Sequence, residues 1–408
     1  MFLPFLSRGR RSAKVGPGRR RRRREANVRT LDVPTPDFNV VNPYSAAIGS
    51  TDSIDPTSKS YTVGVYYPYW ACNVNQPQDT IPFDILTHVY YTHIGLNADG
   101  SLYLPVPELG DGDGNQLTAD ECIKKVKSSR DDQNSSVKLI LSVGSGDGSA
   151  NFSTVADDSD RLETFAESLK TLIDHYGYDG ADIDWETPES TTDGNSYLQL
   201  IKAVRQSLPS SNYTLSAAYT ATDVALDEID VTAVISELDQ FHLMSYDFYG
   251  SWVKDSGYHS QLFSPTVDAD SAANGLSRCL NSSEVDTDKI IIGIPLYAQG
   301  FPDVTGPNEE WNTKDMPDDG IQVRYTDLGI SPFDSKIVYN ETVVAASYYN
   351  DSTNIWYSFD NYNSTAAKVD YVLDNLLGGV FFWQITGDMS ESSGGSLVSL
   401  ASSYLGVS

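Results

Sequence analysis

The stretch YDGADIDWETP, residues 178–188, places four acidic side chains within eight positions of what otherwise has the composition of a buried strand. Side chains alternate between the two faces of a strand, so Asp182, Asp184 and Glu186 share one face. The apolar residues between them share the opposite face: Ala181, Ile183 and Trp185. In a barrel of parallel strands the acidic face would point inward, with Glu186 nearest the C-terminal rim, where barrel enzymes carry their active sites.

Seven further apolar runs accompany this one from residue 61 onward, with helical patterns between them. The eight runs are TVGVYYPYW (62–70), LTHVYYTHI (86–94), VKLILSVG (137–144), YDGADIDWE (178–186), YTLSAAYT (213–220), QFHLMSYDF (240–248), KIIIGIPLYA (289–298) and GGVFFWQI (378–385). The helical patterns are 118–130, 159–176, 191–207, 266–283 and 364–376. Near-continuous apolar strands separated by helices predict an α/β fold with a covered parallel sheet. Eight such units close into a (β/α)8 TIM barrel, with a doubly wound open sheet as the main alternative.

Composition divides the chain into three parts. Residues 1–58 lack periodicity and are rich in Pro, Ser, Thr and charge, which predicts a disordered basic N-terminal tail and linker. Residues 59–408 are predicted to form the barrel. The segment 302–362, between the seventh and eighth predicted strands, is too long for a connecting loop and contains strand-like pieces. We therefore predict a small α+β insertion there.

The charge is uneven along the chain, whose net value is -28. The basic run RRRRRR, residues 19–24, contrasts with a strongly acidic remainder. An acidic body repels phosphate backbones and anionic membranes, so we expect no nucleic-acid and no membrane partner, and a neutral substrate fits better. For the basic run, a disordered arm, a processing site that releases a propeptide and a nuclear-targeting signal all stay open.

The compartment is indicated only indirectly. No apolar run is long enough to cross a bilayer, and the N-terminal MFLPFLSRGRRS contains no clear signal peptide. Sequons for N-glycosylation nevertheless favour an extracellular, secreted glycoprotein, which we expect to be a monomer. The sequons begin at Asn134, Asn151, Asn212, Asn281, Asn340, Asn350 and Asn363. Three cysteines, Cys72, Cys122 and Cys279, permit at most one disulfide.

The acidic face itself suggests acid catalysis. Carboxyl groups two residues apart on a strand lie about 7 Å from one another, and in a partly buried channel their repulsion opposes full ionisation. The group should retain at least one proton near neutral pH, as a general acid for glycosidic cleavage requires. Glu186 is the candidate donor, Asp184 is placed to hold a neighbouring polar group of the substrate, and Asp182 can share a proton with Asp184.

A cation site and a solvated acidic loop are the alternatives for the same acids. Ca²⁺ loops, however, use Asn, Gly and backbone carbonyls in irregular turns rather than apolar alternation within a strand. We therefore predict no metal site, and nothing in the sequence indicates an organic cofactor.

The residues resemble glycoside hydrolase family 18, the chitinases and their relatives. DGADIDWE is similar to the family signature D-x-x-D-x-D-x-E, and four further segments, one before it and three after it, occur in the family's order. SVGSGDGSANFSTVA (142–156) resembles the preceding strand and loop, MSYDFYGSW (244–252) the Met-x-Tyr-Asp strand, and GIPLYAQGF (293–301) and GGVFFWQITGD (378–388) the last two strands. VGVYYPYW (63–70) fits the first strand, so the resemblance spans nearly all of residues 61–390.

The resemblance implies substrate-assisted catalysis, an exception to the usual arrangement of two catalytic carboxylates. By it, Glu186 would protonate the leaving oxygen, while the N-acetyl carbonyl of the substrate attacks the anomeric carbon to form an oxazolinium ion. Asp184 would orient the acetamido group, and Tyr246 would hydrogen-bond its oxygen. Water deprotonated by Glu186 would then open the ring with retention.

Aromatic residues are the candidate sugar-binding surface. Trp383 matches the family tryptophan that floors the reactive subsite, and an aromatic face against a pyranose buries apolar C–H surface. The other candidates for substrate binding are Tyr66, Trp70, Met244, Asp247 and Tyr297. Packing in the core is the open alternative for Tyr66 and Met244, and a structural hydrogen bond for Asp247.

The sequence thus predicts retaining endo- or exo-hydrolysis of β-1,4-N-acetylglucosamine linkages in chitin or chito-oligosaccharides. Two other functions stay open. One is an endo-β-N-acetylglucosaminidase that acts on N-glycans, which can share the acidic motif. The other is a non-hydrolytic chitin-binding lectin, although lectin relatives typically lack the acid that Glu186 supplies.

Overall fold

The computed structural model describes residues 59–407 except 109–115, 265, 267–268, 281–283 and 312–320. The predicted tail at 1–58 and the sequon at Asn281 lie outside the described residues.

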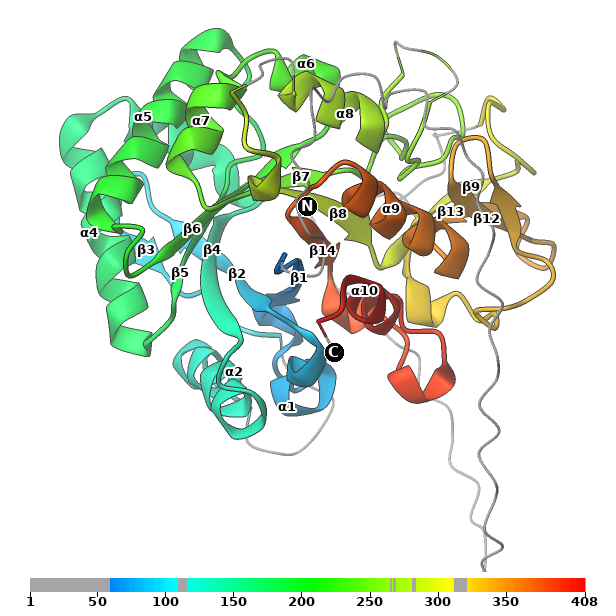
Figure 1. The fold of residues 1–408 in the computed structure, drawn as a ribbon, viewed down its shortest axis with the longest axis horizontal. Helices are drawn as coiled ribbons and strands as arrows, with labels where there is room; N and C mark the ends of the chain where they lie inside the picture. The colour runs from blue at the N-terminus through cyan, green and yellow to red at the C-terminus, as the bar shows by residue number, and fades with distance from the viewer. Residues whose placement is uncertain are drawn as a thin grey trace, which may run out of the picture. The chain divides into compact units, whose positions relative to one another are not determined.

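Eight parallel strands form a closed barrel (Figure 1). The strands are β1 (Thr62–Pro68), β2 (His88–Leu96), β4 (Lys138–Gly144), β5 (Gly180–Asp184), β6 (Thr214–Thr220), β7 (Gln240–Met244), β8 (Ile290–Pro295) and β14 (Gly379–Trp383). Strand β1 pairs with both β14 and β2, which closes the ring. The predicted TIM barrel is confirmed, with one barrel strand in each of the eight apolar runs. A two-residue strand, β3 (Leu102–Tyr103), pairs with the end of β2.

Helices cover the outside of the barrel, and local sequence signals set their ends. The helix α4 (Ser159–Tyr176) begins after the N-cap Asp158 and ends at Gly177, which has the left-handed φ of 66° that glycine adopts without strain. The others are α1 (Pro77–Thr80), α2 (Ala119–Gln133), α3 (Phe152–Ala156), α5 (Thr191–Ser207), α6 (Asp223–Leu226), α7 (Val231–Glu237), α8 (Ala272–Cys279), α9 (Tyr362–Asp374) and α10 (Leu397–Leu405).

The helix predicted at 266–283 is shorter than expected. Its described helical part is α8, which starts after Ser271, whose hydroxyl accepts the N–H of Asn274 and so caps the helix. Before this cap, the Gln261 side chain donates to the carbonyl of Asp270 and holds the chain as a loop. The apolar pattern did not reveal this boundary because the loop residues carry the same mixture of small and polar side chains.

A five-stranded antiparallel sheet is inserted between β8 and β14, in the order β10-β9-β13-β12-β11. Its strands are β9 (Tyr297–Pro302), β10 (Ile321–Arg324), β11 (Val338–Asn340), β12 (Ala345–Asn350) and β13 (Ile355–Phe359). The insertion was predicted, but the single run predicted at 289–298 is divided between two sheets. Its first part is β8 of the barrel, and Tyr297 already belongs to the inserted sheet.

The interior of the barrel holds its own cluster of buried side chains, separate from the larger core between the strands and the helices. Aromatic rings fill much of it: Tyr66, Tyr90, Tyr246, Tyr297 and Phe381, with Trp383 packed against them. Such a layer of rings gives the barrel a solid floor beneath its mouth.

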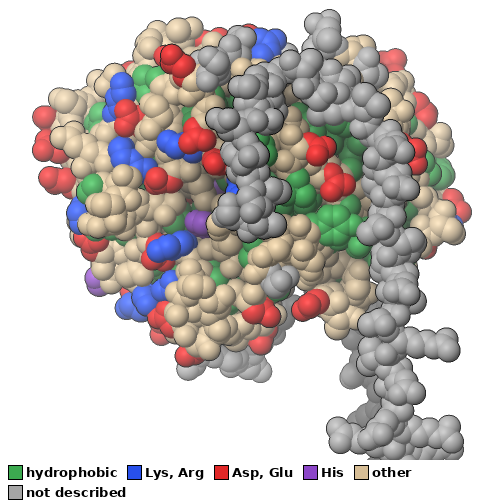
Figure 2. Space-filling model, viewed as in Figure 1, with side chains coloured by type: hydrophobic (Ala, Val, Ile, Leu, Met, Phe, Trp, Pro, Cys, Tyr) green, Lys and Arg blue, Asp and Glu red, His purple; other side chains and the backbone are tan. Residues whose placement is uncertain are grey.

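A disulfide joins Cys72, just after the first strand, to Cys122 in α2, while Cys279 is buried as a free thiol. Among the described residues, no helix combines the length and apolar character that a membrane span needs. On the face shown in Figure 2, acidic side chains are spread among scattered lysines and arginines.

A fully buried ion pair fastens the insertion to the barrel. Lys368 of α9 donates to Asp360, just after β13, at 2.7 Å, and the Ser260 hydroxyl of the long segment after β7 donates to the same oxygen at 2.7 Å. Both charged side chains have no exposed surface. Because each charge is removed from water, either one would be costly without its partner.

We expect Asp360→Ala to lower the free energy of unfolding by about 3–5 kcal/mol, because it leaves the Lys368 ammonium buried and unpaired. Urea denaturation followed by tryptophan fluorescence measures the loss. The double substitution Asp360→Ala with Lys368→Met should recover most of it, and an equal loss in both proteins would contradict the explanation.

Candidate active site

The four acids of the opening stretch occupy two different environments along β5. Asp179 precedes the strand on the outside, where Arg130 and Lys138 lie 3.3 and 3.5 Å from its carboxylate oxygens. Asp182 and Asp184 point into the barrel and are buried. The strand ends at Asp184, so Glu186 stands beyond it at the C-terminal mouth. The row of acids therefore runs from the barrel interior to its opening.

Asp182 is held by hydroxyl groups from three other strands, two of which are the neighbours of β5. Ser142 and Ser216, which lie opposite it in β4 and β6, each donate at 2.7 Å, and Tyr66 of β1 donates at 2.9 Å. Burial raises the pKa of Asp182, and the three hydrogen bonds only partly offset that rise. The donors therefore fix the carboxyl in place without forcing it to ionise.

Asp184 has fewer partners than Asp182. It is 3% exposed, and its Oδ1 atom is buried with no hydrogen-bond partner. The nearest basic nitrogen is Nδ1 of His93, 3.8 Å from Oδ2. Burial raises the pKa of Asp184 well above its usual value, and the charges of Glu186 and Asp182 raise it further. The carboxyl therefore favours its protonated form and has an oxygen available to a ligand.

Glu186 carries the proton that the site can donate. Burial of its carboxyl among neighbouring groups raises the pKa of Glu186 to about 7, although the residue as a whole is exposed at the mouth. The charge of Asp247 adds to the rise, and a hydrogen bond from the backbone of Gly146 opposes it. The backbone N–H of Glu186 donates to the Ser149 hydroxyl at 2.8 Å, which fixes the chain after the strand.

Asp247 faces the same mouth from the end of β7. Its φ of 60° lies in the left-handed region, which turns its side chain sharply away from the strand direction. Oδ1 accepts the Tyr297 hydroxyl at 2.7 Å and the Gln299 amide at 2.9 Å, and Nδ1 of the buried His259 lies 3.6 Å away. The inserted sheet thus supplies Tyr297 as a hydrogen-bond donor to Asp247.

Aromatic rings surround the acids. Trp383, half-buried at the end of β14, lies 5.5 Å from the Tyr66 ring, 5.5 Å from the His93 ring and 6.5 Å from the Trp70 ring, measured between ring centroids. Tyr246 is buried beneath the mouth, with ring centroids of Tyr297 and Phe381 6.2 Å away. Trp70 and Trp383, both partly exposed, therefore lie together at this end of the barrel.

The structure brings the predicted residues together at one end of the barrel, at different depths. Glu186, Asp247, Trp70 and Trp383 reach the mouth, whereas Tyr66 and Met244 lie in the interior cluster. Tyr66 is 1% exposed and hydrogen-bonded to Asp182, so it is a partner of the buried acids and does not line the opening. Met244 is 9% exposed and packs with the other interior side chains.

Sequence reasoning missed several polar residues of the site. Ser142 and Ser216 carry the clearest signal, since each is a small hydroxyl residue with an apolar residue on either side of it in its strand. His93, His242, His259 and Gln299 had no comparable signal. Nδ1 of His242 and the Tyr66 hydroxyl form a hydrogen bond of 2.9 Å deep in the barrel interior.

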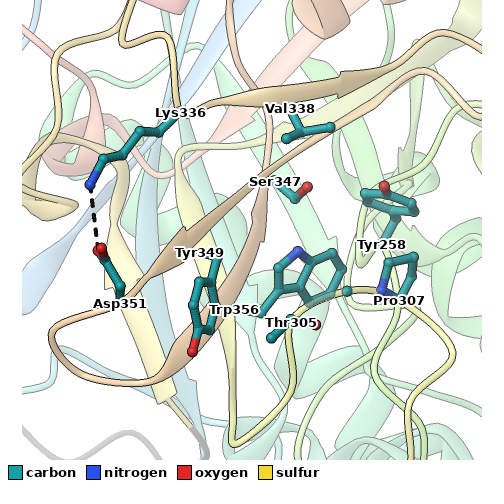
Figure 3. Close-up of a pocket in the computed structure, with 10 residues that line it drawn as sticks. Tyr258, Thr305, Pro307, Lys336, Val338, Ser347, Tyr349, Asp351 and Trp356 are labelled. Carbon is teal, nitrogen blue, oxygen red and sulfur yellow. Dashed lines mark hydrogen bonds and ion pairs between the residues drawn. The ribbon is translucent and has the colours of Figure 1, made fainter.

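Two hollows open on the surface of the described residues. One, of about 490 Å³, extends from Glu186 along the ends of β5 and β6 and is lined by Thr187, Thr220, Val224 and Glu228 among others. The other, of about 480 Å³, lies on the inserted sheet between Tyr349, Trp356 and Tyr258 (Figure 3). Only the first contains an acid of the predicted site. No cluster of three metal-ligating side chains occurs within the described ranges.

The comparisons identify the family and its relatives. The model of glycosyl hydrolases family 18 matches residues 62–388. Chitinase 1 of Aphanocladium album is 26% identical over 90% of this chain and 91% of its own. Sporulation-specific chitinase 2 of Saccharomyces cerevisiae is 26% identical over 83% of this chain and 77% of its own.

Solved structures share the fold. The Group IV chitinase of Ostrinia furnacalis superposes with a TM-score of 0.74 at 24% identity, covering 85% of this chain and 100% of its own. The chitinase of Cycas revoluta in complex with (GlcNAc)3 superposes with a TM-score of 0.71 at 24% identity, covering 84% of this chain and 99% of its own.

We expect Asp247→Asn to lower the pKa of Glu186, because the anionic neighbour that opposes its ionisation becomes neutral. Carboxyl ¹³C NMR of the labelled protein measures the titration midpoint, with Glu186→Gln to assign the resonance. Glu163→Gln, on the exposed side of α4, is the control. A midpoint that stays near 7 in the Asp247 variant would contradict the electrostatic coupling.

Proposed function

The chain belongs to glycosyl hydrolases family 18, and we propose that it cleaves β-1,4-linked N-acetylglucosamine polymers or oligomers, as a chitinase does, with retention of configuration. The observation that carries the proposal is the pair formed by Glu186 and Asp184. Glu186 can keep a proton near neutral pH at the open mouth, and Asp184 lies two residues deeper with an unpartnered oxygen. The matched relatives, named as chitinases, support the substrate class.

In this mechanism, Glu186 donates its proton to the bridging oxygen as the bond from that oxygen to the anomeric carbon breaks. The carbonyl oxygen of the substrate's own acetamido group forms the new bond to the anomeric carbon, which yields a cyclic oxazolinium ion. Asp184 accepts a hydrogen bond from the acetamido N–H and stabilises the positive charge that develops there. The Tyr246 hydroxyl donates a hydrogen bond to the acetamido oxygen.

The second half-reaction returns the enzyme to its starting state. Glu186, now ionised, removes a proton from a water molecule, whose oxygen attacks the anomeric carbon and opens the ring. Asp182, which lies deeper in the barrel, assists both steps. It can share a proton with Asp184, so that the charge on Asp184 can change during the reaction. The three hydroxyl donors on Asp182 support that role, since they hold the carboxyl in either state.

The rings at the opening support a neutral, partly apolar ligand. Trp383 and Trp70 present aromatic faces on which the C–H surface of a pyranose can pack, and the acids supply polar contacts on the other side. An uncharged sugar suits an acidic protein better than an anionic ligand would.

The direct test is hydrolysis of labelled chito-oligosaccharides beside a high-mannose glycopeptide. We expect cleavage of the chito-oligosaccharides, and expect Glu186→Gln to reduce kcat by at least about a hundredfold while sugar binding survives, because the variant has no proton to donate. Calorimetry on the variant measures the binding. Cleavage of the glycopeptide alone would favour an endo-β-N-acetylglucosaminidase, and binding without cleavage of either substrate a lectin.

We expect Trp383→Ala to weaken binding of a chito-oligosaccharide by about 1–3 kcal/mol, because it removes the ring against which the sugar packs. The measurement is calorimetry in the Glu186→Gln background, so that the ligand stays intact. Trp252→Ala, at a tryptophan that is 58% exposed in the segment after β7, is the matched comparison. An unchanged affinity in the Trp383 variant would assign that ring to the core.

A further inference from the structure

His93 occupies a place in the site that neither the motifs nor the proposed mechanism explains. It follows Tyr91 and Thr92 near the end of β2, and 8% of its surface is exposed. Its ring packs against two tryptophans, with centroids 5.8 Å from Trp70 and 5.5 Å from Trp383 and interplanar angles of 30° and 33°. The two tryptophan centroids are 6.5 Å apart, so all three rings contact one another, and we call them the Trp70–His93–Trp383 wall.

The same ring faces the least satisfied acid of the site. Nδ1 lies 3.8 Å from Oδ2 of Asp184, too far for a direct hydrogen bond but close enough for the ring dipole to act on the carboxyl. Nδ1 also forms a hydrogen bond with the Thr92 hydroxyl, which limits rotation of the ring. Burial lowers the pKa of His93 to about 3, so the ring is neutral in the working range of the site. The contact with Asp184 is therefore dipolar, not an ion pair.

A neutral ring at this position has a chemical consequence. A cation there would hold Asp184 ionised, whereas a phenyl ring would offer it no polar partner. The neutral imidazole has an intermediate effect. It stabilises the ionised form of Asp184 a little, but not enough to keep the carboxyl ionised before the substrate binds. Its neighbours at the wall are uncharged. The ionisable groups coupled electrostatically to Asp184 among the described residues are the carboxyls of Asp182 and Glu186 and the hydroxyls of Tyr66, Tyr197 and Tyr246.

We propose that His93 is a positioning residue for Asp184, held in the Trp70–His93–Trp383 wall so that its neutral ring orients that carboxyl toward the acetamido group of the substrate. The proposal rests on the proposed function. It separates two contributions of one side chain: the ring completes the wall, and the ring nitrogens act on Asp184.

Two substitutions separate these contributions. His93→Phe keeps a ring packed against both tryptophans and removes the nitrogens. We expect kcat for a chito-oligosaccharide to fall about tenfold, KM to change less than about twofold, and the acidic limb of the pH profile to move to higher pH, because the charged form of Asp184 is less stabilised. His93→Ala also opens the wall, so KM should rise as well. His175→Phe, at an exposed histidine of α4, is the matched control.

A second readout does not depend on turnover. In ¹³C NMR of protein labelled at the aspartate carboxyls, with Asp184→Asn to assign the resonance, His93→Phe should move the titration of Asp184 to higher pH. If His93 only stabilises the fold, both variants would lose thermal stability while kcat per active site, the pH profile and this titration stay as in the wild type, which would overturn the proposal. A wild type that titrates as expected but hydrolyses no chito-oligosaccharide would refute the proposed function alone.

Discussion

Three carboxyl groups, two on β5 and one just beyond its end, cannot all be ionised together beside a barrel interior lined with aromatic rings. This constraint shapes the rest of the site. Burial raises the pKa of Asp182, Asp184 and Glu186, and repulsion from Glu186 and Asp182 adds to the rise at Asp184. The outermost carboxyl, that of Glu186, is the one that water and substrate can reach. The group behaves as a unit, because a proton that leaves one carboxyl changes what the other two can hold. The barrel provides the geometry by ending the strand at Asp184 and turning the chain so that Glu186 stands at the mouth.

The surroundings of these acids consist of neutral donors rather than cations. Asp182 receives three hydroxyl hydrogen bonds, and Asp184 faces a neutral imidazole. Hydroxyl and imidazole groups can support a carboxyl in either protonation state, whereas a lysine or arginine would fix the ionised state. The inserted sheet contributes in the same way, since Tyr297 and Gln299 hold Asp247 through neutral hydrogen bonds.

Much of this arrangement could be predicted from the sequence, for reasons that are local. The ends of α4 and of α5 agree with the predicted 159–176 and 191–207 because N-cap residues stand immediately before both helices, Asp158 and Ser190. The row of acids was visible because alternation along a strand is a fixed geometric rule. Tyr297 was assigned to the wrong sheet because an apolar run reveals burial but not the strand with which it pairs. The contacts of His93 with Trp70 and Trp383 could not be predicted, since they join β2 to residues far away in the sequence and no local pattern encodes them.

Asp179 and Asp184 show how far position decides the chemistry of identical side chains. They lie five residues apart around one short strand, at its opposite ends and on opposite sides of the sheet. Arg130 and Lys138 surround Asp179, and its Oδ2 also accepts the backbone N–H of Leu139 at 2.8 Å, so this carboxylate joins β4 and α2 to the start of β5. Asp184 has no cation beside it among the described residues, and one of its oxygens has no partner. A carboxylate that is already satisfied has little to offer a substrate. Asp184 is available for an acetamido group because its oxygen has no partner in the protein. Leaving a buried carboxyl unpartnered is unfavourable, and the packed rings and the acids held by hydrogen bonds around Asp184 keep the site folded in spite of that.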